Sequence, residues 1–238
     1  MKNLGFEQIV PQILGNSQKG QDSFIQHAFN IFGTTNKYYV EFGAEDGYYL
    51  SNTSYLREKK DWSGLLIEGK MGPEIPEINL RRRFILKDNI CDLFKEFEVP
   101  IEHDFLCVDL DGNDYWIMKS ILEGGYKPRV IMCENNVRFQ PYESMVMKYN
   151  PNWYWDAVKW YGGSPYAFKK LFNQHDYIPV WIHIDDMIVV RKDVLIEFGY
   201  EEPDWNYVYP KANAKIYEEH RRGDYFVHEP DWSTWETV

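Results

Sequence analysis

The sequence has little cysteine. Its 238 residues include only Cys91, Cys107 and Cys133, an odd number without the C-x-x-C spacing of zinc sites and redox motifs. Two of the three lie inside apolar runs. We therefore expect reduced, buried thiols rather than disulfides or metal ligands.

Long apolar runs are also missing. None approaches the ~20 residues that a transmembrane helix needs. The opening residues, MKNLGFEQIV, lack the apolar core of a signal peptide. The sequence predicts no membrane span and a cytoplasmic location.

Cations are scarce as well: 26 Lys and Arg face 37 Asp and Glu, for a net charge of −11. This balance argues against a nucleic-acid partner, which would need clustered Lys and Arg. The one basic run, 81–83, leads into an apolar segment and is interpreted as a solvated strand entry, with anion binding as the alternative. The expected partner is a small-molecule or saccharide acceptor, and a homo-oligomer is left open.

What the sequence does contain is enough apolar surface for a packed core, with 44% hydrophobic residues. Its length favours one domain over residues 1–238, with a core at about 18–192 and a C-terminal extension over 193–238. The sequence also contains five short runs that are apolar at nearly every position. Such runs are typical of parallel strands buried on both faces. They lie at Tyr38–Phe42, Gly64–Ile67, Phe84–Leu86, Phe105–Val108 and Val130–Cys133.

Helical patterns fall at 18–33, 51–60, 91–97, 114–122 and 163–175. A long loop is expected over 135–162, a hairpin of strands Tyr177–Ile182 and Met187–Arg191 turning at Asp185-Asp186, and no clear period after 196. This alternation predicts an α/β fold: a Rossmann-like, doubly wound, mostly parallel sheet of about seven strands with a C-terminal antiparallel hairpin.

Two motifs favour an adenosine site. Val40-Glu41-Phe42-Gly43-Ala44-Glu45-Asp46-Gly47 places two glycines directly after a strand, where they allow a tight turn and a close ligand. It lacks the third glycine of a dinucleotide fingerprint. Glu68 closes the second strand and can accept hydrogen bonds from both ribose hydroxyls. Neither motif separates a methyl donor from a nicotinamide.

Acidic residues end the fourth and fifth strands. Asp109, Asp111 and Asp114 follow one strand, and Glu134-Asn135 ends the next. Asp109, Glu134 and Asn135 could converge there and hold Mg²⁺ or Mn²⁺, which prefer oxygen ligands. The alternative for Asn113 and Asp114 is a helix cap, and a lone Glu134 would be a solvated strand end.

Two residues are candidates for general base, Asp111 and His183. A lone histidine is more often structural. The aromatic segment 148–166, with Trp153, Trp155, Trp160 and Tyr161, is a candidate wall for the acceptor, and Trp153 and Tyr161 are the expected substrate contacts.

These motifs together resemble the FkbM-like methyltransferases. The resemblance covers roughly residues 18–192 and rests on Gln21-Asp22, 39–47, Ser51-Asn52-Thr53 with Leu56, 62–68, 108–116, Glu134-Asn135-Asn136, Gly163-Ser164 and Tyr177. It implies an S-adenosylmethionine-dependent methyltransferase, commonly acting on oxygen, such as a sugar hydroxyl in surface-polysaccharide or secondary-metabolite synthesis. The cofactor contacts expected with it are Glu41, Gly43, Ala44, Gly47, Ser51, Asn52, Thr53, Glu68, Asp88 and Asp109, with Asp88 near the adenine.

The strand ends are also similar to those of catechol-type, metal-dependent O-methyltransferases, which carry an Asp and an Asp-Asn pair at these places. Glu134 replaces the second Asp here. Gly112 stands where those enzymes have their basic lysine. A metal is therefore compatible with the pattern, but the base must be another residue or be dispensable.

The main rival is a glycosyltransferase, because Asp109-Leu110-Asp111 is formally a D-x-D that could hold a metal and a nucleotide diphosphate. No basic group for the diphosphate is evident beside it. A nicotinamide oxidoreductase and a non-catalytic binding module are less favoured by the same motifs.

Overall fold

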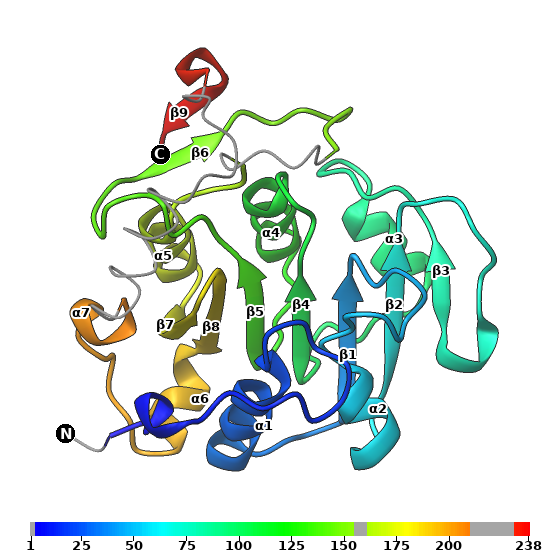
Figure 1. The fold of residues 1–238 in the computed structure, drawn as a ribbon, viewed down its shortest axis with the longest axis horizontal. Helices are drawn as coiled ribbons and strands as arrows, with labels where there is room; N and C mark the ends of the chain where they lie inside the picture. Colours follow the sequence, from blue (N-terminus) through cyan, green and yellow to red (C-terminus); the bar gives the residue numbers. More distant parts are fainter. Residues whose placement is uncertain (1–2, 155–160, 210–230) are drawn as a thin grey trace.

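The structure is a computed structural model that describes residues 3–154, 161–209 and 231–238. Seven strands form one sheet in the order β3-β2-β1-β4-β5-β8-β7 (Figure 1). All run parallel except β8, which is antiparallel to both of its neighbours. The predicted Rossmann-like α/β class is confirmed. The strands are β1 (Tyr38–Phe42), β2 (Ser63–Glu68), β3 (Leu80–Arg82), β4 (Phe105–Val108), β5 (Val130–Glu134), β7 (Tyr177–His183) and β8 (Asp186–Arg191).

Helices cover both faces of the sheet because the central strands are apolar on both sides. Val40 and Phe42 of β1 pack with α3, α4, α5 and α7 in one cluster, whereas Tyr39 packs with α1, α2 and α6 in another. This is the doubly covered arrangement that the continuous apolar runs predicted. The helices are α1 (Gln21–Phe32), α2 (Ser54–Lys60), α3 (Ile90–Glu96), α4 (Asp114–Glu123), α5 (Pro165–Gln174), α6 (Lys192–Glu197) and α7 (Trp205–Val208), with short 3₁₀ turns η1 (Phe6–Gln8), η2 (Pro76–Ile78) and η3 (Trp232–Thr234).

The order of the strands reverses between β1 and β4. Ligands of open α/β sheets bind at such a point, outside the carboxyl ends of the strands. That edge is at the top of Figure 1. Because β8 runs the other way, its first residue, Asp186, lies at this edge and pairs with Glu134, the last residue of β5.

One predicted strand was wrong. The third strand is Leu80–Arg82 rather than Phe84–Leu86. Leu80 is fully buried and pairs with Leu66, whereas Phe84 is 54% exposed. Arg81 and Arg82 belong to the strand itself. An edge strand tolerates them because the Arg81 guanidinium and the Arg82 backbone amide both donate to Glu74.

Two further strands, β6 (Met145–Met147) and β9 (Trp235–Thr237), form a small antiparallel sheet above the carboxyl edge (Figure 1). The expectation of a long loop over 135–162 was therefore wrong at β6, and the residues after 196, which show no clear period, contain β9 and α7. Three-residue strands carry too short a pattern to read, and each of these two depends on a partner far away in sequence.

Among the helices that the structure describes, none is long and apolar enough to cross a membrane. All three cysteines are free. Cys107 and Cys133 are buried and Cys91 is half-buried, in agreement with the expected thiols.

Candidate functional site

The glycine turn after β1 lies against the end of β4. Gly43 has a φ of +68°, a left-handed conformation that glycine adopts without strain. A Cβ there would lie 2.2 Å from the carbonyl oxygen of Asp109. Any other residue would push these two strand ends apart, so Gly43 sets the width of the switch point.

Glu41 supports this turn from below. Its buried carboxylate accepts hydrogen bonds from Ser51 Oγ at 2.8 Å, the Asn52 amide at 2.7 Å and Thr53 Oγ1 at 2.5 Å. Burial raises the pKa of Glu41, against the lowering by these donors. All four side chains are at most 5% exposed. The structure places these expected cofactor contacts as an internal brace that holds the turn, together with the buried Ala44.

Glu68, at the end of β2, faces the same turn. Its carboxylate is 6% exposed and accepts hydrogen bonds from the Glu45 amide at 3.0 Å and the Lys70 amide at 2.6 Å. The Lys70 ammonium pairs with the Glu45 carboxylate. A carboxylate has about four acceptor positions, so Glu68 is fixed in place and keeps capacity for further donors.

Three carboxylates meet at the ends of β4 and β5. Asp109, Asp111 and Glu134 each offer one oxygen, and these oxygens lie within 4.8 Å of one another. Burial raises the pKa of Asp109 and Glu134 well above the usual range, and the neighbouring carboxylates raise both further. Burial also raises the pKa of Asp111, opposed by the nearby Lys70. Such a group must share protons or bind a cation.

Asn135 follows Glu134 directly, and the carboxylate cluster contains Asp111 in addition to the predicted ligands Asp109 and Glu134. The Asn135 side-chain amide donates to the Asp185 carbonyl at 2.7 Å. Its Oδ1 is buried, as is Oε2 of Glu134, and neither oxygen has a hydrogen-bond partner among the described residues. Asn135 itself is 1% exposed. Unpaired buried acceptors of this kind are costly unless a donor or cation serves them.

The β7–β8 turn and the segment before α1 add residues that the sequence did not point to. Lys19 Nζ lies 2.8 Å from the Asp185 carboxylate, and Gln21 donates to Asp186 at 2.9 Å. Burial first, then the charge of Asp185, raises the pKa of Asp186 to about 7. The predicted hairpin could have suggested Asp186, because its turn falls at the carboxyl edge. Lys19 had no signal.

Asp114 shapes the loop that carries the cluster. Its buried carboxylate accepts hydrogen bonds from the Leu110 amide at 2.7 Å and the Gly112 amide at 2.8 Å. Burial raises its pKa to about 7. Asn113 precedes α4 but makes no side-chain cap; it bonds to the backbone of Asn150 instead. Both residues therefore hold loops in place.

The two expected substrate contacts lie at this edge. Trp153 donates through Nε1 to the Asp111 carbonyl at 2.9 Å, and Tyr161 donates to Glu134 at 2.9 Å. Tyr161 is 8% exposed, whereas the neighbouring Tyr154 is 77% exposed. Trp155 and Trp160 lie outside the described residues.

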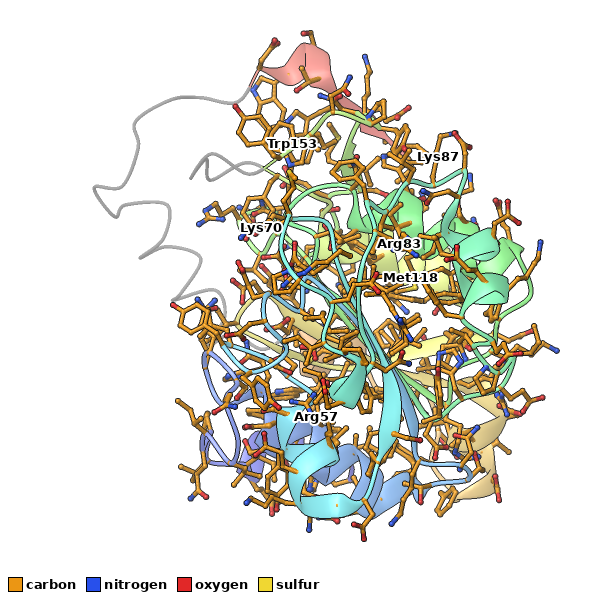
Figure 2. The ribbon with its side chains drawn as sticks, turned by 90° about the vertical axis from the view of Figure 1, so that its right-hand side faces the viewer. Arg57, Lys70, Arg83, Lys87, Met118 and Trp153 are labelled. Carbon is orange, nitrogen blue, oxygen red and sulfur yellow. The ribbon has the colours of Figure 1, made fainter. Side chains whose placement is uncertain are left out.

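Two candidates lie apart from the cluster. His183 has its ring stacked on Phe24, with centroids 4.3 Å apart, and Nε2 donates to the Lys19 carbonyl. Asp88 is in the turn before α3, its side chain is 79% exposed, and it lies 3.4 Å from the ammonium of Lys87. Figure 2 shows Lys87 well to the side of Lys70 and Trp153.

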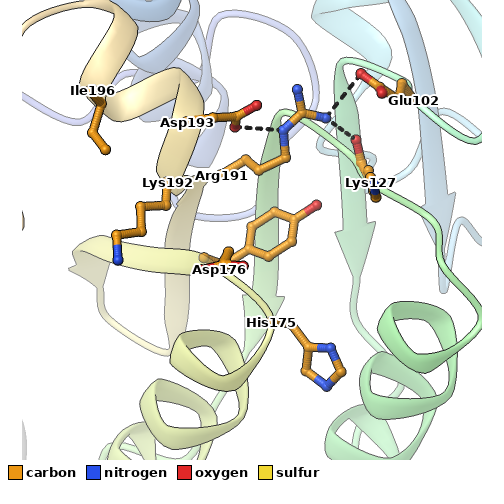
Figure 3. Close-up of a pocket in the computed structure, with 9 residues that line it drawn as sticks. Glu102, Lys127, His175, Asp176, Arg191, Lys192, Asp193 and Ile196 are labelled. Carbon is orange, nitrogen blue, oxygen red and sulfur yellow. Dashed lines mark hydrogen bonds and ion pairs between the residues drawn. The ribbon is translucent and has the colours of Figure 1, made fainter.

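A cavity of about 440 Å³ lies at the opposite, amino edge of the sheet (Figure 3). Arg191 spans it with hydrogen bonds to Asp193 at 2.7 Å and Glu102 at 3.1 Å. Arg191 thus pairs with two of the acidic residues that line the cavity, and none of the residues expected to act in a site lines it.

In comparisons with known proteins, no family model and no curated protein matches this chain. The resemblance to FkbM-like methyltransferases stays a prediction, and the function is argued from the site alone.

Proposed function

We propose that this protein is an S-adenosylmethionine-dependent O-methyltransferase. The observation that carries the proposal is an acidic cluster at the switch point of the sheet, beside a strand-ending glutamate. Glu68 and the turn at Gly43 lie on one side of this point, and Asp109, Asp111 and Glu134 lie on the other.

The charge of the cluster favours a cationic ligand. Six carboxylates gather at the ends of β4, β5 and the β7–β8 turn, and the two lysines described beside them, Lys19 and Lys70, are each paired with a carboxylate. A sulfonium ion and an amino group suit such a cluster. Without a bound cation, the cluster would repel the diphosphate of a nicotinamide cofactor. The carboxylates are Asp109, Asp111, Asp114, Glu134, Asp185 and Asp186.

The residues of β1 and β2 fit the adenosine part. Glu68 keeps free acceptor positions for ribose hydroxyls, and the exposed backbone at Gly43 lets a ligand approach closely. Glu41, Ser51, Asn52 and Thr53 hold that backbone. S-adenosylmethionine supplies an activated methyl group when bound, and the protein must align the acceptor oxygen in line with it.

The acidic cluster also fits a divalent cation. Opposite oxygen ligands of Mg²⁺ are about 4.2 Å apart, twice its usual bond length. The 4.8 Å envelope of Asp109, Asp111 and Glu134 is close enough for small side-chain movements to reach that size. We propose that these three residues hold Mg²⁺ or Mn²⁺, which would lower the pKa of an acceptor hydroxyl.

The acceptor side is formed by Trp153, Tyr154 and Tyr161. The ring of Tyr154 is exposed beside this polar cluster, and an exposed aromatic face suits a sugar ring, so a saccharide hydroxyl is the proposed acceptor. His183 is held by Lys19 and Phe24, which favours a structural role. Asp111 is the better base if no cation takes part, because its pKa is raised and it is half-buried.

Calorimetric titration tests the cofactor. S-adenosylmethionine and S-adenosylhomocysteine should bind, and UDP-glucose with Mn²⁺ and NAD⁺ should not. Glu68→Gln should weaken both adenosyl ligands by about 5- to 150-fold, the loss of ~1–3 kcal/mol of hydrogen bonding to a charged acceptor. Glu77→Gln, on the exposed surface of η2, is the matched control and should bind as the wild type does. Binding of UDP-glucose alone would replace this proposal by the glycosyltransferase.

A second titration tests the cation. Mn²⁺ should bind the wild type, and Asp109→Asn and Glu134→Gln should each abolish Mn²⁺ binding while S-adenosylhomocysteine still binds. Methyl transfer from labelled S-adenosylmethionine to a panel of monosaccharides should stop in EDTA and return with Mg²⁺ or Mn²⁺. Full transfer in EDTA would remove the metal and leave Asp111 as the base to test.

A further inference from the structure

The loop that carries Asp111 is covered by the segment 147–153, which is attached to α4 and to its preceding turn by three sets of contacts. Trp116 Nε1 donates to the Met147 carbonyl at 2.8 Å. The Asn113 side chain bonds to both the amide and the carbonyl of Asn150. Trp153 then donates to the Asp111 carbonyl at 2.9 Å.

Trp153 lies directly on Gly112. A Cβ on Gly112 would be 2.1 Å from Nε1 of the indole, so the absence of a side chain lets the ring reach the Asp111 carbonyl. Asp111 itself has a φ of +54°, a conformation that a non-glycine residue keeps only when its surroundings hold it. The ring therefore holds a strained residue of the acidic cluster.

Trp153 is in turn supported from a distant part of the chain. Trp235 of β9 pairs with Met147 of β6, and with Phe139 these residues form a small buried cluster against which Trp153 packs. Trp235 is 5% exposed, and its ring centroid lies 5.1 Å from that of Phe139. The Lys148 amide donates to the Thr234 carbonyl at 2.7 Å, which attaches the segment 147–153 to the strand that carries Trp235.

From this continuous packing we infer that Trp235 is a positioning residue for the candidate site, acting through Trp153 on the backbone of Asp111. Nothing in the sequence pointed to Trp235, which lies outside the part of the chain that resembles a methyltransferase. The expected effect of Trp235 on methyl transfer rests on the proposed function. The packing of Trp235 against the support of Trp153 is independent of that function, and the experiments below test the two separately.

Hydrogen exchange measured by mass spectrometry tests the packing relationship. Trp235→Ala should speed exchange of the amides at 110–112 by at least about tenfold, because Leu110 and Gly112 lose their fixed hydrogen bonds to Asp114. Exchange in β1 and β2 should stay unchanged. Trp153→Ala should give the same increase, and the double variant should add nothing further, since both act through one contact.

Two variants guard against a merely structural effect. Trp235→Phe should restore slow exchange, because an aromatic ring still fills the cluster. Ser233→Ala, in the same short segment but exposed and with its hydroxyl bonded only to Asp231 among the described residues, should leave 110–112 unaffected. Equal exchange in the wild type and in Trp235→Ala would overturn the inference, as would a uniform increase throughout the sheet.

Calorimetry and transfer assays then address the acceptor side. Trp235→Ala should bind S-adenosylhomocysteine with the wild-type Kd, and kcat for the monosaccharide that accepts methyl should fall about tenfold or more. If the wild type binds no adenosyl ligand but the exchange result holds, the proposed function fails and the positioning role stands. If the wild type transfers methyl and Trp235→Ala does so equally well, the positioning role fails and the function stands.

Discussion

An aspartate lies at each end of β4, and the two have opposite surroundings. Asp104, just before the strand, is fully buried and accepts hydrogen bonds from Thr35, Asn36 and Lys37, with Arg129 3.6 Å away. Asp109, just after it, has other carboxylates as its charged neighbours, and burial and their repulsion raise its pKa.

The difference teaches how to separate a structural charge from a functional one. A buried carboxylate that is fully paired stabilises a fold only weakly in net terms but is expensive to disrupt. A crowded, unpaired group costs stability and is kept for binding or chemistry. Stability measurements on the protein without ligands can therefore distinguish the two edges of the sheet.

The largest effect is expected at Asp104. Asp104→Asn removes the charge that faces Arg129, which is 8% exposed, and leaves that cation uncompensated. We expect a loss of about 3–5 kcal/mol in the free energy of unfolding, measured with urea. A loss below about 1 kcal/mol would mean that the Asp104 carboxylate at the amino edge is no better paired than the carboxylates at the carboxyl edge.

The pH dependence of stability should come next. Asp186 has a pKa of about 7 against an ordinary value of 3.8, so the native state holds a proton that the unfolded chain releases. Its stabilising contribution is complete below about pH 4 and is lost as pH rises through 7. Between pH 4 and pH 8, Asp186→Asn should gain about 2–4 kcal/mol relative to the wild type. The exposed Asp92→Asn should run parallel to the wild type; a parallel Asp186→Asn curve would contradict the assignment.

At Asp109 the expected change is opposite in sign to that at Asp104. At pH 8, without cation or cofactor, Asp109→Asn should stabilise the protein by roughly 1–3 kcal/mol, because it removes repulsion from the cluster. The same variant should fail to bind Mn²⁺. If Asp109→Asn destabilises as much as Asp104→Asn does, the contrast between the two ends of β4 is wrong.

The smallest effect belongs to the rim of the amino-edge cavity. Asp193 pairs with Arg191, but its side chain is 66% exposed, and such surface pairs contribute little. Asp193→Ala should change the free energy of unfolding by no more than about 0.5 kcal/mol. A larger change in the urea midpoint would show that this pair is part of the structural edge as Asp104 is.

The fold was predictable from the sequence wherever a strand is buried on both faces. The strand predicted at Val130–Cys133 falls within β5, for example, because every residue of a central strand is buried and therefore apolar. The prediction failed at β3, where Leu80 alone is buried and the arginines beside it look like a loop. It also failed at β6 and β9, because a three-residue strand has no period and its partner is distant.

The candidate site was predictable only in part, and for a related reason. Asp109, Asp111 and Glu134 follow strands that the sequence located, so their placement at one edge follows from parallel topology. Asp186 enters through an antiparallel strand, and Lys19 through a segment without secondary structure. The sequence also could not show that the Glu41 carboxylate accepts hydrogen bonds from Ser51, Asn52 and Thr53, since these bonds depend on the path of the chain before α2.

The pairing of β6 with β9 has a consequence for biosynthesis. Met145 and Thr237 are in contact across 92 residues, and Lys19 reaches Asp185 across 166. Strands β1, β2 and β4 can associate while the ribosome is still working, because they leave it early and close together. The cover over Asp111 has to wait until Trp235 has emerged. A nascent or prematurely stopped chain would thus carry an assembled sheet with an uncovered acidic cluster, and translation to residue 235 marks the point at which the loop that carries Asp111 can first be covered.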